Sequence, residues 1–135
     1  MIDTKTAPYA ALILRVSLGI LFLAHAGLKF FVFTPAGAAA FFGSLGLPGW
    51  FAYVVMLAEA AGGVALILGI YTRIVAIALI PILAGAIVMV HGAKGFYTST
   101  DGWEFLALWI AGQLALAAVG DGPYALKPTP AKVKL

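Results

Sequence analysis

The sequence contains no cysteine and very few charged residues. Without cysteine, neither a disulfide framework nor a thiolate metal site can form. Only 10% of the 135 residues are charged, whereas 64% are hydrophobic. A soluble domain carries about 25% charged residues, so this chain has too little polar surface to face water on all sides. The composition predicts an integral membrane protein that has the lipid bilayer as its surroundings.

Several motifs of soluble proteins are also missing from the sequence. It has no glycine-rich nucleotide loop, no Cys/His metal pattern and no candidate serine triad, so neither a metal site nor a covalently bound cofactor is expected. The net charge of +3 is small and indicates no nucleic-acid partner. The N-terminal stretch MIDTKTAPYA does not open a secretory signal, because the apolar run after it exceeds the roughly 7–15 residues of a signal core.

Four apolar segments approach the length of about 20 residues that a membrane helix needs. They cover residues 9–31, 50–70, 72–91 and 103–119. Between the first two, Thr34 as N-cap and Pro35 at the first helical position predict a short interfacial helix, with a plain apolar loop as the alternative. The predicted fold is an all-α membrane protein with four transmembrane helices in an antiparallel bundle.

The basic residues predict how this bundle is oriented. Four spans place both termini on one side, and most Lys and Arg residues gather there: Lys5, Arg73, Lys127, Lys132 and Lys134. Since Lys and Arg favour the cytoplasmic side, the termini are expected in the cytoplasm. The predicted divisions are an N-terminal segment (1–8), one transmembrane domain (9–120) and a flexible or surface-bound tail (121–135).

Glu59 is the ionisable residue nearest the middle of a predicted span. It follows Trp50 by nine residues, roughly 13 Å along a helix. Its partner must come from another helix, and we expect an ion pair with Arg15 and a hydrogen bond from His25. Such a pair could also serve only to fix which helices meet. Lys29, one turn from His25, fits either a ligand-binding role or that of an anchor at a helix end.

Two similar segments, LAHAGLKFF and MVHGAKGFY, contain the two histidines of the chain and end the first and third spans on the outer side. Together with nearby groups they could form a polar pocket for a quinone, which needs hydrogen-bond partners, an acid or base, and aromatic walls. The catalytic candidates are Glu59 and His25. The ligand-binding candidates are Arg15, Lys29, His91, Phe22, Trp103 and Glu104.

Other functions stay open at this point. A non-catalytic membrane scaffold that docks partner proteins, a small carrier, and a haem between His25 and His91 are the alternatives. The small-residue step from Ala58 to Gly62 favours close helix packing, either within the bundle or in a homo-oligomer.

From Tyr9 to Leu126 the sequence resembles the DoxX family of small bacterial membrane proteins. The resemblance rests on Arg15, Gly19 and Phe22 before HAGLKFF, on Glu59 with Gly62–Gly63 before LGIYTR, and on VHGAKGFY, GWEF and GDGPYAL. Ala26 departs from the glycine usual after the histidine. The resemblance implies a four-helix protein of the bacterial inner membrane and an oxidoreductase component. It also implies quinone as acceptor, membrane or soluble oxidoreductase partners, and functional roles for Arg15, His25, Lys29, Glu59 and His91.

Overall fold

The structure is a computed structural model that describes residues 1–133. Lys134, one of the basic residues that predict the orientation of the bundle, lies outside the described residues. It contains five α-helices: α1 (Ala7–Gly27), α2 (Pro35–Ser44), α3 (Trp50–Leu68), α4 (Thr72–Ala86) and α5 (Glu104–Val119). No strand occurs within residues 1–133, and the only bridge there joins Ile70 to Lys127. The all-helical prediction is confirmed.

Three helical stretches are long and apolar enough to cross a membrane. They are Ala7–Val32, Trp50–Leu68 and Thr72–Lys94, and two of them continue past their α-helix into a π-helical segment, η1 (Leu28–Val32) or η2 (Ile87–His91). Helix α5 is apolar but has 16 residues. At 1.5 Å per residue it covers about 24 Å, less than the roughly 30 Å of a hydrocarbon core.

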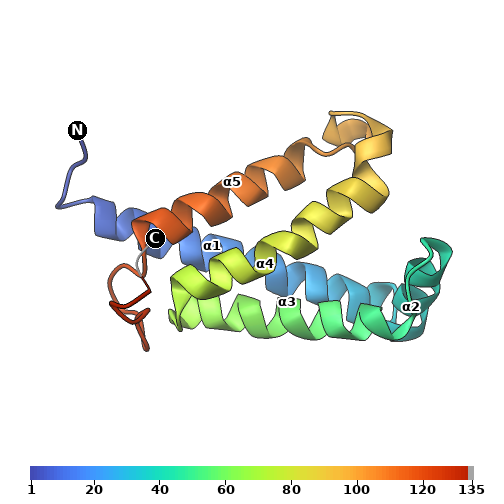
Figure 1. The fold of residues 1–135 in the computed structure, drawn as a ribbon, viewed down its shortest axis with the longest axis horizontal. Coiled ribbons are helices and arrows are strands. Elements are labelled where there is room, and N and C mark those ends of the chain that lie inside the picture. Colours follow the sequence, from blue (N-terminus) through green and yellow to red (C-terminus); the bar gives the residue numbers. More distant parts are fainter. Residues whose placement is uncertain (134–135) are drawn as a thin grey trace.

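The long helices lie side by side along the long axis of the molecule (Figure 1). Residues 1–6, the α3–α4 turn and residues 120–133 lie at one end, here called the terminal end. Helix α2 and residues 92–103 lie at the other, the distal end. Helix α1 packs against α3 and α5, and α4 packs against the same two helices. The ion pair and aromatic groups described below lie within this four-helix arrangement.

Helices α1 and α3 approach each other most closely where two glycines meet. A Cβ atom added to Gly63 would lie 2.8 Å from the carbonyl oxygen of Gly19, and one added to Gly19 would lie 2.7 Å from that of Gly63. Gly62 instead faces the side chain of Leu79. The close backbone approach expected from the Ala58–Gly62 step therefore occurs one residue further on, and it is internal to the bundle.

The interior and the surface of the bundle are both apolar. A central cluster includes Phe22, Leu66, Leu79, Trp109 and Leu116. Large apolar side chains also point outward along the helices, among them Ile13, Leu57, Ile77, Leu108 and Leu114. A surface of this kind suits lipid better than water.

Helix α2 forms where the sequence predicts a short helix. The Thr34 hydroxyl accepts a hydrogen bond from the Gly37 N–H at 3.2 Å, and Pro35 occupies the first turn. Ala38 is buried against Ala52 and Met56 of α3. The capping prediction is confirmed, and α2 closes the distal end beside the start of α3 (Figure 1).

The C-terminal segment folds back onto the α3–α4 turn. The N–H of Tyr71 donates to the carbonyl of Lys127 at 2.9 Å, and the N–H of Lys127 donates to the carbonyl of Gly69 at 3.1 Å. The N–H of Leu126 donates to the carbonyl of Leu68 at 3.0 Å. These three hydrogen bonds hold residues 126 and 127 against the α3–α4 turn.

Asp121 fastens this segment to the first turn of α4. Its Oδ1 accepts hydrogen bonds from Thr72 N (3.2 Å), Thr129 N (3.0 Å) and Thr129 Oγ1 (2.9 Å). The residue preceding α4, Tyr71, provides no side-chain cap, so Asp121 takes that role from a distant part of the chain. Burial raises the pKa of Asp121, but the hydrogen bonds from Thr129 and Thr72 outweigh it and hold the pKa below its ordinary value.

Candidate functional site: a buried lysine–glutamate pair beside a histidine

Lys29 and Glu59 form a buried ion pair between η1 and α3. The Lys29 ammonium donates to both carboxylate oxygens, at 3.0 Å to Oε1 and 2.9 Å to Oε2. The Glu59 side chain is 5% exposed and that of Lys29 is 21% exposed. Glu59 thus has the partner from another helix that its burial requires, and Lys29 is more than an anchor at a helix end.

The expected pair between Arg15 and Glu59 is wrong. The Arg15 guanidinium, 1% exposed, donates to four backbone carbonyls instead. Nη1 reaches Leu66 O (3.3 Å) and Ile67 O (2.6 Å), Nε reaches Asp121 O (3.0 Å) and Nη2 reaches Pro123 O (2.7 Å).

The cause of this error is the position of Arg15 along the bundle. Leu66 and Ile67 belong to the last turn of α3, about two helical turns beyond Glu59. Carbonyls in the last turn of a helix carry the negative end of the helix dipole, so they attract a cation. Arg15 consequently binds the terminal end of the bundle and does not belong to the polar site around Glu59.

His25 lies among aromatic side chains of α1 and α5. Its ring centroid is 4.9 Å from that of Trp109 and 6.5 Å from that of Phe105, and Phe22 lies 4.8 Å from Trp109. The hydrogen bond expected from His25 to Glu59 is not formed among residues 1–133. His25 and Lys29 are one turn apart on one helix face. The imidazole therefore lies beside the ion pair, but it forms no hydrogen bond with Glu59.

Phe105 and Trp109 were not predicted from the sequence as members of this cluster. Their spacing of four residues places them on one face of α5, which is a usable signal. It does not reveal which neighbouring helix that face meets. Phe22, Phe105 and Trp109 together form an aromatic cluster around His25.

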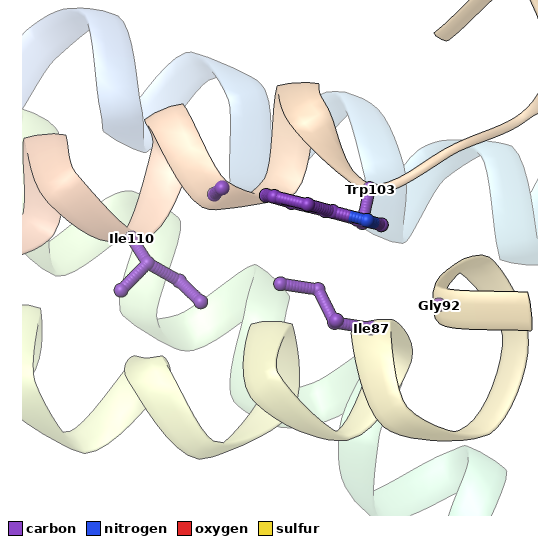
Figure 2. A pocket seen from close by; sticks show the side chains of 5 residues that line it. Ile87, Gly92, Trp103 and Ile110 are labelled. Atoms are coloured by element: carbon purple, nitrogen blue, oxygen red, sulfur yellow. The ribbon is translucent and has the colours of Figure 1, made fainter. Parts of the chain in front are cut away.

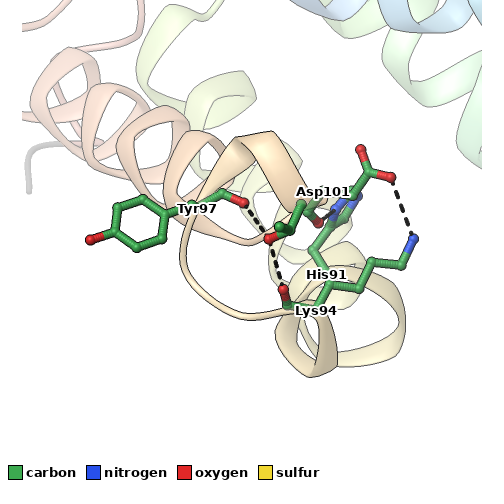
Figure 3. A network of polar contacts seen from close by, with 5 residues as sticks. His91, Lys94, Tyr97 and Asp101 are labelled. Carbon is green, nitrogen blue, oxygen red and sulfur yellow. Dashed lines mark hydrogen bonds and ion pairs between the residues drawn. The ribbon is translucent and has the colours of Figure 1, made fainter.

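His91 serves the loop at the distal end (Figure 3). Its Nδ1 lies 2.6 Å from the carbonyl oxygen of Asp101. A carbonyl can only accept, so Nδ1 carries the hydrogen, and in the neutral ring Nε2 is the unprotonated nitrogen. Thr100 Oγ1 adds hydrogen bonds to Lys94 O (3.1 Å) and Tyr97 O (3.0 Å), and Lys94 pairs with Asp101 at 3.8 Å.

Glu104 also organises this loop. Its Oε1 accepts a hydrogen bond from the N–H of Thr98 at 3.0 Å, while the carboxylate lies in the first turn of α5, where a negative charge is favourable. Glu104 and His91 therefore hold the segment from 92 to 103 in place. Neither is brought into contact with the Lys29–Glu59 pair.

Trp103 lines an apolar groove between η2 and α5, about 470 Å³ in volume. The other lining residues are Ile87, Gly92, Ala107 and Ile110. Figure 2 shows the flat Trp103 ring lying along α5 with Ile87 and Ile110 facing the same space. None of the lining groups is charged, so this groove suits a hydrocarbon chain rather than a polar head group.

The two histidine segments differ more than their sequences suggest. His25 lies in the last turns of α1, just before η1, whereas His91 is the final residue of η2. π-Helical segments within helices are often found at functional sites. Among residues 1–133, no cluster of three or more His, Asp or Glu side chains has the arrangement to hold a metal ion.

The groups gathered near His25 are suited to proton transfer and to hydrogen bonding. The Lys29 ammonium is a donor, the Glu59 carboxylate is an acceptor, and the imidazole can act as either. Their low-dielectric surroundings strengthen every such interaction. These three side chains can therefore donate, accept and exchange protons.

Comparison with known proteins identifies the family of the chain. The DoxX family model matches residues 10–92, which include most of α1, all of α2, α3 and α4, and both histidines. A Bacillus subtilis (strain 168) protein named "Putative oxidoreductase CatD" is 37% identical over 124 residues, covering 92% of this chain and 89% of that protein. No solved structure matches the chain. The chain belongs to the DoxX family of membrane proteins.

Proposed function

We propose that this protein is an integral membrane subunit of a quinone-linked oxidoreductase system, with its ligand pocket at the distal end. The observation that carries the proposal is the Lys29–Glu59 pair, whose nitrogen–oxygen distances are 2.9 and 3.0 Å, with His25 one turn away among aromatic rings. The oxidoreductase name of the Bacillus subtilis relative supports the same class of function.

In the proposed membrane arrangement, α1, α3, α4 and α5 are four antiparallel spans of a bacterial inner membrane. Residues 9–120 form the transmembrane domain, flanked by cytoplasmic segments 1–8 and 121–135. The terminal end carries Arg73 and the exposed residues Lys5, Lys127 and Lys132, which supports a cytoplasmic location. The distal end, with the ligand pocket and α2 at the interface, then faces outward.

In the proposed reaction, the protein's own groups handle protons while a partner oxidoreductase supplies electrons. Reduction of a quinone to a quinol takes up two electrons and two protons. Lys29 and His25 are placed to donate hydrogen bonds to the carbonyl oxygens and to pass protons to them as they are reduced. Glu59 holds the ammonium in position and stabilises its charge in the apolar interior.

The remaining candidates have supporting positions in this proposal. Phe22 packs beside the ring site, and Trp103 lines the groove that suits an isoprenoid tail. His91 and Glu104 build the loop at the mouth. Arg15, which binds carbonyls at the terminal end, is assigned to the stability of the fold.

Quenching of Trp109 fluorescence by a short-chain quinone tests this proposal. The sequence has three tryptophans, so W50F and W103F leave Trp109, next to His25, as the single probe. Titration in nanodiscs should quench it saturably, and Lys29→Met or Glu59→Gln should weaken binding at least tenfold, about 1.4 kcal/mol. Asp101→Asn, in the exposed pair with Lys94, is the matched control and should bind as the parent does. Equal binding by all four proteins would contradict the proposal.

A second candidate function is a scaffold that docks partner proteins. It is favoured by the aromatic side chains at the end of the first span, where Phe30, Phe31 and Phe33 are 54%, 79% and 55% exposed. A scaffold should co-purify with its partner equally well as wild type and as Glu59→Gln. It should lose the partner when Phe31 is replaced by Ser.

A further inference from the structure

Besides Thr72 Oγ1 at the start of α4, two buried side-chain polar atoms, both in α5, lack a hydrogen-bond partner among residues 1–133. They are the Trp109 Nε1 and the Gln113 Oε1, on side chains that are 3% and 0% exposed. Leaving a buried donor or acceptor unpaired costs about 1–3 kcal/mol each. Native cores rarely leave two such groups close together without a bound molecule to satisfy them.

Both atoms belong to one face of α5. Trp109 and Gln113 are four residues apart, so they are neighbours on the helix surface. Side chains of a helix lean toward its N-terminus, which directs Gln113 toward the turn that carries Trp109. One side chain therefore presents a donor, and the other an acceptor, to the same region of the core.

The orientation of the Gln113 amide is set by its other contact. Its Nε2 donates to the carbonyl oxygen of Ala76 in α4 at 2.9 Å. A flipped amide would place two oxygens against each other, so the nitrogen must face Ala76. Oε1 is consequently the atom that needs a donor, while the indole N–H of Trp109 needs an acceptor.

We propose that Trp109 and Gln113 bind an internal water molecule between α1, α4 and α5. Water can accept from the indole N–H and donate to Oε1 at once, and buried waters bind with as few as two polar partners. A quinone carbonyl would satisfy only Trp109, because it has no hydrogen to donate. A cation would satisfy only Gln113 and would face the positive end of the N–H bond.

This water site does not depend on the proposed redox function. It lies one helical turn further along α5 than the contact between Trp109 and His25, whose ring centroids are 4.9 Å apart. A water there extends the polar groups of the bundle from Lys29, Glu59 and His25 toward the Ala76 carbonyl.

Nuclear Overhauser effects between indole N–H protons and water test the inference in the full chain, labelled with ¹⁵N-tryptophan and reconstituted in nanodiscs. The Trp109 signal, identified by its loss in Trp109→Phe, should show a cross-peak at the water frequency with the sign of a long-lived bound water. Trp50, which is 64% exposed, reports exchange with bulk water for comparison.

The proposal also predicts how this cross-peak responds to perturbation. Gln113→Met, which keeps the volume but removes the acceptor, should abolish it; if that variant does not fold, the wild-type measurement decides alone. Absence of the cross-peak in the wild type, or its survival at full intensity in Gln113→Met, would overturn the water site. Loss of the cross-peak on adding a short-chain quinone would also overturn it, since the occupant would then be exchangeable with that ligand. Weak quinone binding alone would contradict only the proposed function.

Discussion

Replacing Lys29 by Met and Glu59 by Gln, singly and together, measures how strongly these two residues depend on each other. The structure joins them through two contacts of 2.9 and 3.0 Å in an environment where Glu59 is 5% exposed. A second cycle combines Arg15→Met with Glu59→Gln. It serves as the matched control, because Arg15 binds only carbonyls of the terminal end.

The expected magnitudes follow from the burial of the pair. Removing one member of a buried ion pair leaves the other charge uncompensated and costs about 3–5 kcal/mol in the free energy of unfolding. Lys29 is 21% exposed, so solvent screens part of the interaction and a value near 3 kcal/mol is expected for each single change. The double variant leaves no unpaired charge, and the coupling energy should be about 1–3 kcal/mol.

The Arg15 cycle should give a different result. The carbonyls of Leu66 and Ile67 lie about 11 Å along α3 from Glu59, so the two changes should add within about 0.3–0.5 kcal/mol. Unfolding in mixed micelles of mild detergent and sodium dodecyl sulfate, followed by far-ultraviolet circular dichroism, provides both free energies. A Lys29–Glu59 coupling close to zero, or an Arg15–Glu59 coupling above about 1 kcal/mol, would refute the assignment of partners.

Three further predictions concern packing, acidity and the tail. Gly63→Leu should lower the free energy of unfolding by at least about 2 kcal/mol, because a Cβ atom at this position would lie 2.8 Å from the Gly19 carbonyl oxygen. Gly85→Ala is the control, because a Cβ atom there meets no neighbouring atom within 4 Å. Thermal unfolding compares the two variants. Folding lowers the pKa of Asp121, so its carboxylate stabilises the folded protein at a pH above its ordinary pKa of 3.8, and this stabilisation is lost as the pH falls below that value. The free energy of unfolding, measured between pH 3 and 7, should show this loss in the wild type and not in Asp121→Asn. The same Asp121→Asn change should also speed proteolysis after Lys127 at neutral pH, and equal cleavage rates would contradict the docking of the tail.

Composition and periodicity predicted the helices because both follow from local chemistry. The expected spans 9–31, 50–70 and 72–91 agree with Ala7–Val32, Trp50–Leu68 and Thr72–Lys94 to within a few residues. Apolar length and the capping residues Thr34 and Pro35 are properties of neighbouring positions in the chain. The fourth expected segment, 103–119, agrees with α5 (Glu104–Val119) to within one residue, and at 16 residues this helix is shorter than the other three.

Partners across helices could not be predicted in the same way. Glu59 required a partner from another helix, and the first helix offered two candidates, Arg15 on one side of its expected depth and His25 on the other. Arg15 was expected because an arginine side chain is long enough to bridge a helical turn or more, whereas in the structure its guanidinium donates to four backbone carbonyls. Two of these carbonyls belong to residues 121 and 123, and no pattern in the neighbouring sequence predicts that this segment packs against the first helix.

The same difficulty applies to the aromatic surroundings of His25. Phe105 and Trp109 lie some 80 residues further along the chain, and their contact with α1 depends on the packing of α5 against it. The histidine itself was recognisable from its place near a helix end. Its neighbours required the three-dimensional arrangement.

The Arg15 contacts also have a consequence for the order in which the protein assembles. Two of its carbonyl partners follow it in the chain by 106 and 108 residues, after all the long helices. Until those residues emerge from the ribosome and return to the bundle, a guanidinium on the first helix has only part of its acceptors. The first helix therefore does not reach its final hydrogen bonding until residues 121 and 123 have been synthesised and have packed against it. A nascent chain arrested before residue 121 would carry an arginine with unsatisfied hydrogen-bond donors, which membrane quality-control proteases could recognise.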